Sequence, residues 1–242
     1  MSTKKSTPRT PVRKQRDSSV TKKASAPSRR PGRPGGARDE NRRARTEALR
    51  KAALGLFLVR GIEAVTIDEI AEGAGLAKGS FYRYFEDKTA LVAALFAPVT
   101  QHVEQALTRC EARLTEVKDR SAAYAAYQEL ALGLLPIALF HFDVVRLYLQ
   151  ESRGPSEGAR APVAALVDLV ERGAVRLSEV AVEHGIVAVA DPRITAHATV
   201  GAIEQLTLAV LRGRLDAAPL EIVSTLIRTI MDGVGVRPEG AR

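Results

Sequence analysis

The sequence is poor in the residues on which disulfide bonds, metal sites and nucleophilic active sites depend. Its 242 residues include no tryptophan, one cysteine and four histidines. The single cysteine, Cys110, excludes an internal disulfide and a cysteine-based metal cluster, and it fits a reducing cytoplasm. The histidines lack metal-ligand spacing, and no serine has the context of a nucleophile elbow. We therefore expect no catalytic residues, no metal, no cofactor and no enzymatic activity.

Long apolar runs are also missing. The longest, Leu130 to Phe140, contains a glycine and a proline and is too short to span a bilayer. No apolar stretch follows the basic residues near the N-terminus, so we do not expect a secretory signal. These absences predict a soluble cytoplasmic protein without a membrane partner.

Positive charge is concentrated near the N-terminus. Residues 1–38 hold 12 Lys and Arg against one Asp, whereas residues 39–242 carry a net charge of −3. The same segment is rich in Ser, Thr, Pro and Gly and nearly lacks large apolar residues, so it cannot bury enough surface to offset its ordering entropy. We predict a disordered basic tail over residues 1–38.

From Asp39 onward, apolar residues recur at spacings of three and four, which predicts an all-α protein with about nine helices. Asp39 and Asp87 are expected to cap the helices that follow them. We expect Pro98 to kink or break a helix and Pro136 to mark an interruption between two others. The expected helices cover residues 39–60, 66–74, 77–85, 88–117, 121–140, 141–151, 162–184, 193–212 and 219–233.

Residues 73–80, GAGLAKGS, resemble a phosphate-binding loop at first sight. A dinucleotide fingerprint needs a strand before its glycines, but here a helix precedes them, opened by the capping-box pattern of Thr66 and Glu69. A P-loop needs its lysine after the last glycine, whereas Lys78 comes before Gly79. What remains is a helix, a tight turn and a second helix. This is a helix-turn-helix, whose second helix can enter the DNA major groove.

The second of these helices has two distinct faces. Phe81 and Phe85 are four residues apart and should point inward. The opposite arc carries Gly79, Ser80, Tyr82 and Arg83, with Lys78 at its edge. That arc is polar, cationic and aromatic, as a surface that reads base edges should be. An ordinary solvated face on a short helix is the alternative.

Residues 66–95, TIDEIAEGAGLAKGSFYRYFEDKTALVAAL, resemble the DNA-binding signature of the TetR family of bacterial transcriptional regulators. The resemblance is carried by Thr66, Ile70, Ala71, Ala74, Gly75, Ser80, Phe81, Tyr82, Phe85, Lys88 and Leu91. It implies a three-helix DNA-binding domain over residues 39–86, followed by a larger helical regulatory and dimerisation domain over residues 87–236 and a short tail, 237–242. Beyond residue 95, only the number and length of the helices match the family.

The resemblance also implies which side chains meet DNA. The candidates for phosphate contacts are Thr66, Tyr82, Tyr84 and Lys88. The candidates for base edges are Lys78, Gly79, Ser80 and Arg83. The chemistry agrees, since Arg and Lys pair with guanine and tyrosine hydroxyls suit phosphate. The family often has a bulkier residue at Gly79, which predicts a closer approach of the backbone to DNA here.

The basic tail contains a second DNA-binding pattern. Residues 29–36, RRPGRPGG, resemble the Gly-Arg-Pro core of an AT-hook, which makes Arg29, Arg30 and Arg33 candidates for contacts in the minor groove. The tail precedes the first helix directly, as the minor-groove arms of homeodomains do. A simple solvated tail is the alternative. Deleting residues 1–38 should weaken DNA binding and flatten its salt dependence.

The regulatory domain offers candidates for a small-molecule pocket. Polar side chains on its apolar helices are His102, Tyr124, Tyr127, Gln128, His141, Arg146 and Gln150. For each of them a structural role in the core or at its boundary is the alternative, and Asp143 is a possible ion-pair partner of Arg146. The effector is unknown.

Apolar stripes on the last two helices are candidates for a homodimer interface. In the family these helices form a four-helix contact between subunits. The candidate residues are Ile203, Leu206, Val210, Ile222, Leu226 and Ile230. Two-fold symmetry would require a roughly palindromic double-stranded DNA operator. Packing within one subunit is the alternative.

Two functions follow from these patterns. The first is a dimeric, sequence-specific transcriptional repressor that a small-molecule ligand releases from its operator. The second is a nucleoid-type DNA-binding protein that tolerates many sequences and relies on the basic tail. Competition by random DNA separates the two.

Overall fold

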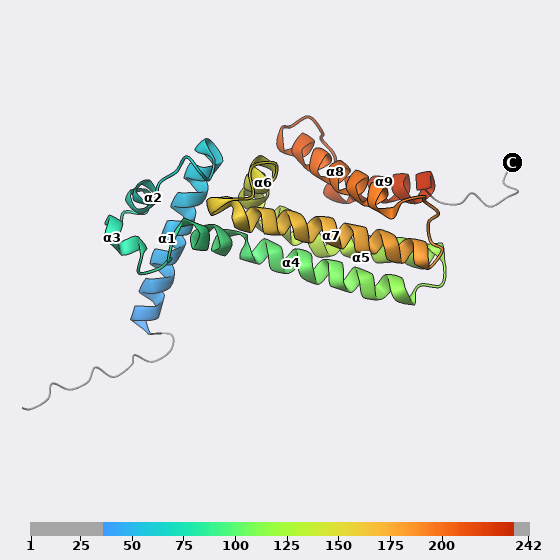
Figure 1. Ribbon diagram of the computed structural model, residues 1–242, viewed down its shortest axis with the longest axis horizontal. Helices are drawn as coiled ribbons and strands as arrows, with labels where there is room; N and C mark the ends of the chain where they lie inside the picture. Colours follow the sequence, from blue (N-terminus) through green and yellow to red (C-terminus); the bar gives the residue numbers. More distant parts are fainter. Residues whose placement is uncertain (1–35, 235–242) are drawn as a thin grey trace, which may run out of the picture.

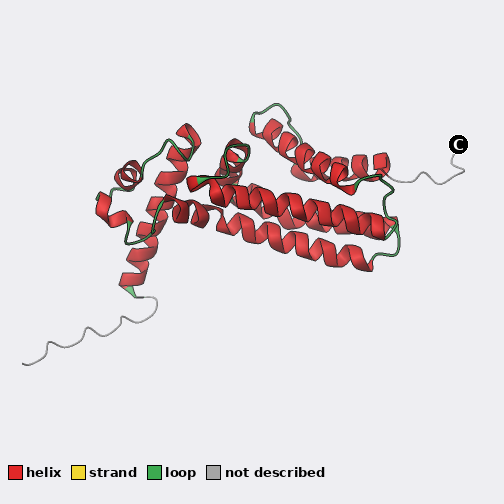
Figure 2. Cartoon of the chain, in the orientation of Figure 1, coloured by secondary structure: helices red, strands yellow, loops and turns green. Residues whose placement is uncertain are grey.

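The computed structural model describes residues 36–234, and within this range the all-α prediction is confirmed (Figures 1 and 2). The described chain contains nine α-helices and one 3₁₀ turn, with no strand. Their bounds are α1 Ala37–Arg60, α2 Ile67–Gly73, α3 Lys78–Phe81, α4 Lys88–Glu116, α5 Arg120–Phe140, α6 Phe142–Glu151, η1 Gly158–Arg160, α7 Ala161–Glu183, α8 Pro192–Leu211 and α9 Pro219–Val234. The tail candidates Arg29, Arg30 and Arg33 lie outside the described residues.

The helices form a small head and an elongated body (Figure 1). Helices α1, α2 and α3 make up the head, at the left of the view. Helix α4 starts beside the head and runs along the body with α5 and α7, while α8 and α9 lie along one side of that bundle. The short helix α6 lies between the head and the body, where it contacts α1.

Side-chain caps set where several helices begin. The Asp87 carboxylate accepts a hydrogen bond from the Ala90 amide at 2.7 Å, which confirms the predicted cap of α4. The predicted cap at Asp39 is wrong, because α1 begins two residues earlier with Gly36 as its N-cap. Asp39 instead lies in the first turn, where its negative charge suits the helix dipole.

Both prolines that were predicted to disturb helices lie inside helices. Helix α4 continues through Pro98, so of the kink or break expected there, the break is absent. Helix α5 continues through Pro136 to Phe140, and the interruption comes at His141. A proline removes one hydrogen bond of the helical ladder, and the bonds on either side of it can carry the helix onward; His141, for example, still donates to the Ile137 carbonyl at 2.9 Å.

The buried apolar side chains form two cores. The first joins the head to the near half of the body, from Leu49 on α1 to Leu166 on α7. The second lies in the far half of the body and includes Cys110, Leu177 and Met231. The head therefore shares its core with the adjacent part of the body.

Two helices, α5 and α8, have more apolar surface than the fold buries. Helices α5 and α8 are long and apolar enough to cross a membrane, each with a mean hydropathy of 1.3, although one or two such helices are weak evidence of a membrane protein. Within one subunit α8 buries only Ala196 fully. Most of its apolar surface therefore lies outside the two cores.

Candidate nucleic-acid interface

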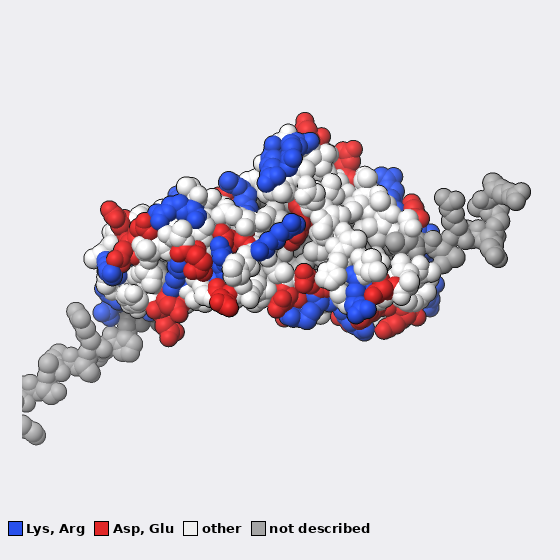
Figure 3. All heavy atoms as spheres, turned by 45° about the horizontal axis from the view of Figure 1, so that its top comes forward, with Lys and Arg blue, Asp and Glu red and all other residues white. Residues whose placement is uncertain are grey.

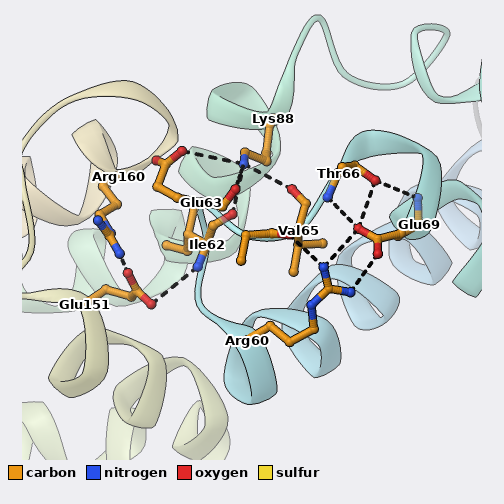
Figure 4. A network of polar contacts seen from close by, with 10 residues as sticks. Arg60, Ile62, Glu63, Val65, Thr66, Glu69, Lys88, Glu151 and Arg160 are labelled. Atoms are coloured by element: carbon orange, nitrogen blue, oxygen red, sulfur yellow. Dashed lines mark hydrogen bonds and ion pairs between the residues drawn. The ribbon is translucent and has the colours of Figure 1, made fainter.

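A capping box fixes the start of α2, as the sequence predicts. The Thr66 hydroxyl accepts from the Glu69 amide at 3.3 Å, and the Glu69 carboxylate accepts from the Thr66 amide at 2.8 Å. Arg60, at the end of α1, donates to Glu69 Oε1 at 2.6 Å and to the Ala64 carbonyl at 2.7 Å (Figure 4). The hydrogen bond from Arg60 is the main cause that lowers the pKa of Glu69 from 4.5 to about 2. The box thus ties α2 to α1.

One glycine makes the turn between α2 and α3 possible. Gly75 has a φ of +67°, in the left-handed region that glycine enters without strain. The turn is closed by hydrogen bonds from the Gly75 amide to the Glu72 carbonyl and from the Leu76 amide to the Ala71 carbonyl, both 2.9 Å. The chain is extended at Ala77 before α3 begins. The predicted role of Gly75 is confirmed.

Helix α3 and the turn that follows it have the buried and the exposed side that the sequence predicts. Phe81 is fully buried and Phe85 is 8% exposed, with their ring centroids 5.8 Å apart. The other face leaves Tyr82 56% exposed, and Arg83 is exposed beside it. The regular helix is shorter than expected and ends at Phe81, because hydrogen bonds of the i to i+3 type tighten the turn that follows.

The remaining candidates on and beside α3 differ in access. Gly79 is exposed, and a Cβ added there would meet no atom within 4 Å. Ser80 is half-buried. Tyr84 is also half-buried and packs against the first core. The unobstructed backbone at Gly79 leaves room for a close approach by a partner.

Lys78 already has a partner on the neighbouring helix. Its Nζ lies 2.6 Å from Asp68 Oδ2, and this hydrogen bond raises the pKa of Lys78. Both side chains are more than half exposed. An exposed pair of this kind contributes little to stability and can be exchanged for another partner. Sequence reasoning missed Asp68, which lies in the first turn of α2, ten residues before Lys78.

Lys88 points toward the loop between α1 and α2 (Figure 4). Its Nζ donates to the carbonyl oxygens of Ile62, Val65 and Glu63 at 2.9, 3.1 and 3.2 Å. Its side chain is 17% exposed and lies 3.7 Å from the Glu63 carboxylate. In this structure Lys88 therefore stabilises the loop by hydrogen bonds. Its contact with a DNA phosphate stays a prediction.

A residue of the body, Glu151, also contacts this loop. Glu151, the last residue of α6, is the one buried charged residue in the described part of the chain, at 4% exposure. Its Oε1 accepts from the Ile62 amide at 3.3 Å, and its Oε2 accepts from Arg160 Nε at 2.5 Å (Figure 4). Sequence reasoning missed Glu151. The available signal was an acidic residue at the C-terminal end of a helix, where the helix dipole disfavours negative charge.

The seven pocket candidates are spread over different surroundings. Gln128 and Arg146 are exposed, and Arg146 pairs with Asp143 at 3.3 Å, as its alternative role predicts. Gln150 donates to the Phe57 carbonyl of α1 at 3.0 Å. These three side chains therefore have surface or structural positions.

The other four pocket candidates are half-buried. The rings of His102 and His141 lie 6.1 Å apart, and His102 Nδ1 is 2.7 Å from the Pro98 carbonyl. Tyr124 donates to the Ser224 carbonyl of α9 at 3.4 Å. Burial raises the pKa of Tyr127. This group lies on α4, α5 and the α5–α6 junction.

Two shallow hollows lie on the surface of the body, away from these candidates. One, of about 170 Å³, is lined by residues 117–120 and 184–186. The other, of about 260 Å³, lies between α7 and His197 of α8. None of the seven pocket candidates lines either hollow. Among the described residues, no group of His, Cys, Asp and Glu is placed to hold a metal ion.

The predicted interface residues on α8 and α9 lie at the surface of the subunit. Ile203 and Val210 are 46% and 38% exposed. Leu206, Ile222, Leu226 and Ile230 are half-buried. Figure 3 shows a broad area without charged side chains over the part of the body where these helices lie. Packing within the chain therefore leaves Ile203 and Val210 exposed and covers the other four in part.

The head matches a described protein family. A model of "Bacterial regulatory proteins, tetR family" matches residues 49–95, which span the second half of α1, the helix-turn-helix and the start of α4. The TetC protein of transposon Tn10 from Escherichia coli is 31% identical over 91 residues, which cover 38% of this chain. The match covers 43% of TetC, so it spans less than half of that relative.

Solved structures resemble the whole fold. The regulator FadR from Bacillus subtilis, in complex with stearoyl-CoA, matches with a TM-score of 0.57 at 16% identity, over 78% of this chain and 98% of that one. AibR, in complex with isovaleryl coenzyme A and operator DNA, matches with a TM-score of 0.55 at 16% identity, over 76% and 97%. At such low identity these matches establish the arrangement of helices in the body.

Proposed function

Because this chain belongs, through its helix-turn-helix region, to the TetR family of bacterial regulatory proteins, we propose that it is a dimeric, cytoplasmic repressor. It binds a roughly palindromic operator and leaves it when a small molecule binds the body. In this proposal the body regulates DNA binding and catalyses no reaction.

The surface of α3 carries this proposal. Buried Phe81 and Phe85 anchor α3 and the turn that follows it, and Tyr82 and Arg83 are exposed at the start of that turn. An arginine on a helix that enters the major groove can pair with guanine O6 and N7, and a tyrosine hydroxyl suits a phosphate oxygen. The turn at Gly75 sets the position of α3 relative to α2.

The experiment that tests the proposal is protection mapping on the DNA that flanks the gene. We expect one protected region with two related half-sites about 34 Å apart, one helical turn, or a multiple of it. The variant Tyr82→Ala/Arg83→Ala should protect nothing at the same concentration, while circular dichroism shows an unchanged fold. If random DNA competes as well as the flanking DNA, a sequence-specific regulator is ruled out.

Acyl-CoA thioesters are the first effector class to test, because two proteins with the same arrangement of helices are described as complexes with stearoyl-CoA and isovaleryl coenzyme A. A short-chain and a long-chain thioester are titrated against the complex with operator DNA, with free coenzyme A as the control. Release by a thioester but not by coenzyme A supports this effector class. No release by either thioester argues against it.

A further inference from the structure

The loop between α1 and α2 is held from two sides by single residues. On one side, Lys88 at the start of α4 satisfies three of its carbonyl groups. On the other side, Glu151 at the end of α6 accepts from the Ile62 amide. The loop runs from Gly61, whose φ is +82°, to Thr66, the N-cap of α2. Lys88 and Glu151, which hold this loop, therefore also fix the position of the start of α2.

The Glu151 carboxylate lies close to the backbone of the loop. A Cβ added to Gly61 would lie 3.1 Å from Glu151 Oε1, so the carboxylate is packed directly against the loop backbone. Its charge is neutralised by Arg160 at 2.5 Å, and the Arg160 guanidinium lies against the backbone of Gly154. Gln150 adds a bond to the Phe57 carbonyl in the last turn of α1. One end of α6 thus holds both α1 and the loop that follows it.

The segment between Glu151 and Arg160 completes the connection. Its turn contains Gly158, with a φ of +62°, which lies beside the Glu63 carboxylate of the loop. The turn returns the chain so that Arg160, at the start of α7, reaches back to Glu151. Helices α6 and α7 and the loop of the head therefore meet at one buried carboxylate (Figure 4).

We propose that Glu151 is a positioning residue for DNA recognition, which fixes the orientation of the head on the body through the Ile62 amide and Arg160. This proposal rests on the proposed function, because it concerns how two heads of a dimer reach two half-sites. A movement of α6 or α7 would pass through this carboxylate to the start of α2. Losing the contact would remove one of the links that set the angle of each head, beside the shared core and Lys88, while leaving α3 intact.

The test compares four full-length variants with the wild type. Glu151→Ala removes the contact, and Glu151→Gln keeps an acceptor for the Ile62 amide. Glu151→Ala/Arg160→Met removes the contact without leaving Arg160 as an unpaired charge. This double variant can therefore be measured if the single variant folds poorly. Glu111→Ala is the matched control, because it breaks an exposed ion pair of 2.8 Å between α4 and α7 that does not touch the head.

The first measurement needs no DNA. Hydrogen exchange of the peptide that contains Ile62 should become faster in Glu151→Ala and in the double variant. It should stay close to wild type in Glu151→Gln and in Glu111→Ala. An unchanged exchange rate in both Ala variants would overturn the proposed contact.

The second measurement separates positioning from simple stability. Affinity is measured for the full operator and for a duplex with one half-site. Loss of Glu151 should weaken binding to the full operator by about tenfold, within the usual range of coupling between sites, and leave half-site binding unchanged. Equal losses on both duplexes would show a merely structural role and overturn the proposal. A wild-type protein that does not prefer the full operator would contradict the proposed function instead, whatever the exchange rate at Ile62.

Discussion

At the scale of single residues, the roles in this head depend on which side chains already have partners. Lys78 is paired with Asp68, and Lys88 is bound to three carbonyl groups. The Arg83 side chain is exposed and makes no ion pair within residues 36–234. Moving Lys88 to DNA would leave the loop carbonyls without their donor, whereas Arg83 can bind DNA at no such cost. Arg83 is therefore the first side chain to test for base recognition.

We predict that Arg83→Ala weakens operator binding by about 1–3 kcal/mol, the usual range for a bidentate contact with a base. Binding to random DNA should change less, so the preference for the operator falls. Titrations by fluorescence anisotropy at one salt concentration measure both affinities. Arg172→Ala, which removes an exposed arginine on α7, is the control and should change neither. Equal losses on both DNAs would make Arg83 a phosphate contact.

Glu69 predicts a pH dependence of stability. Its folded pKa is lowered to about 2, chiefly by the hydrogen bond from Arg60. The stabilisation is therefore complete above the unfolded pKa, near 4.5, and is lost as the pH falls through about 2. Urea unfolding should show wild type more stable than Glu69→Gln at pH 6, with the difference shrinking between pH 4.5 and 2. If the difference in stability between the two proteins stays constant over this pH range, the charge of Glu69 does not cause it. The shape of the side chain would then be the cause.

At the scale of helices, the sequence predicted what depends on neighbouring residues. The cap at Asp87, the capping box at Thr66 and the turn at Gly75 each need only four or five residues, and all three are confirmed. The contact between Ile62 and Glu151 joins residues 89 apart, and no local pattern names such a partner. The interruption predicted at Pro136 comes instead at His141, five residues later.

Helix packing makes Gly173 a sensitive position. A Cβ there would lie 2.4 Å from Leu107 Cδ1, so α7 approaches α4 more closely than an alanine permits. Overpacking costs about 1–3 kcal/mol, and the better helix propensity of alanine returns up to about 1 kcal/mol. We predict that Gly173→Ala lowers the free energy of unfolding by roughly 1 kcal/mol, as urea denaturation can measure.

The matched control is Gly55→Ala on α1, where an added Cβ meets no atom within 4 Å. Propensity alone acts there, so we expect this variant to gain about 0.5–1 kcal/mol. A similar gain in Gly173→Ala would mean that Leu107 moves aside freely, and the close approach would then have no cost.

At the scale of the whole molecule, burial is unevenly distributed. The cores lie in the head and among the body helices, while α8 keeps an apolar surface with only Ala196 fully buried. Such a helix gains hydrophobic stabilisation only when something covers it. A second subunit is the simplest cover, because two-fold symmetry places the same apolar surface opposite itself.

We predict that Ile203→Glu converts the proposed dimer into a monomer. The side chain is 46% exposed in one subunit, and a two-fold interface would bury the new carboxylate twice without a partner. An unpaired buried charge costs several kcal/mol, and each loss of about 1.4 kcal/mol raises the dissociation constant tenfold. Sedimentation velocity at low micromolar concentration should therefore show a monomer with unchanged helical content.

Leu139→Glu is the matched control, because it adds the same charge at the exposed end of α5. Leu139 is 61% exposed and lies outside the predicted interface, so this variant should stay dimeric. The Ile203→Glu monomer should bind a single half-site as wild type does, because its α3 is untouched. It should lose its preference for the full operator, since two linked heads bind two half-sites more tightly than either head alone. A dimer that survives Ile203→Glu but dissociates with Leu139→Glu would place the interface on α5.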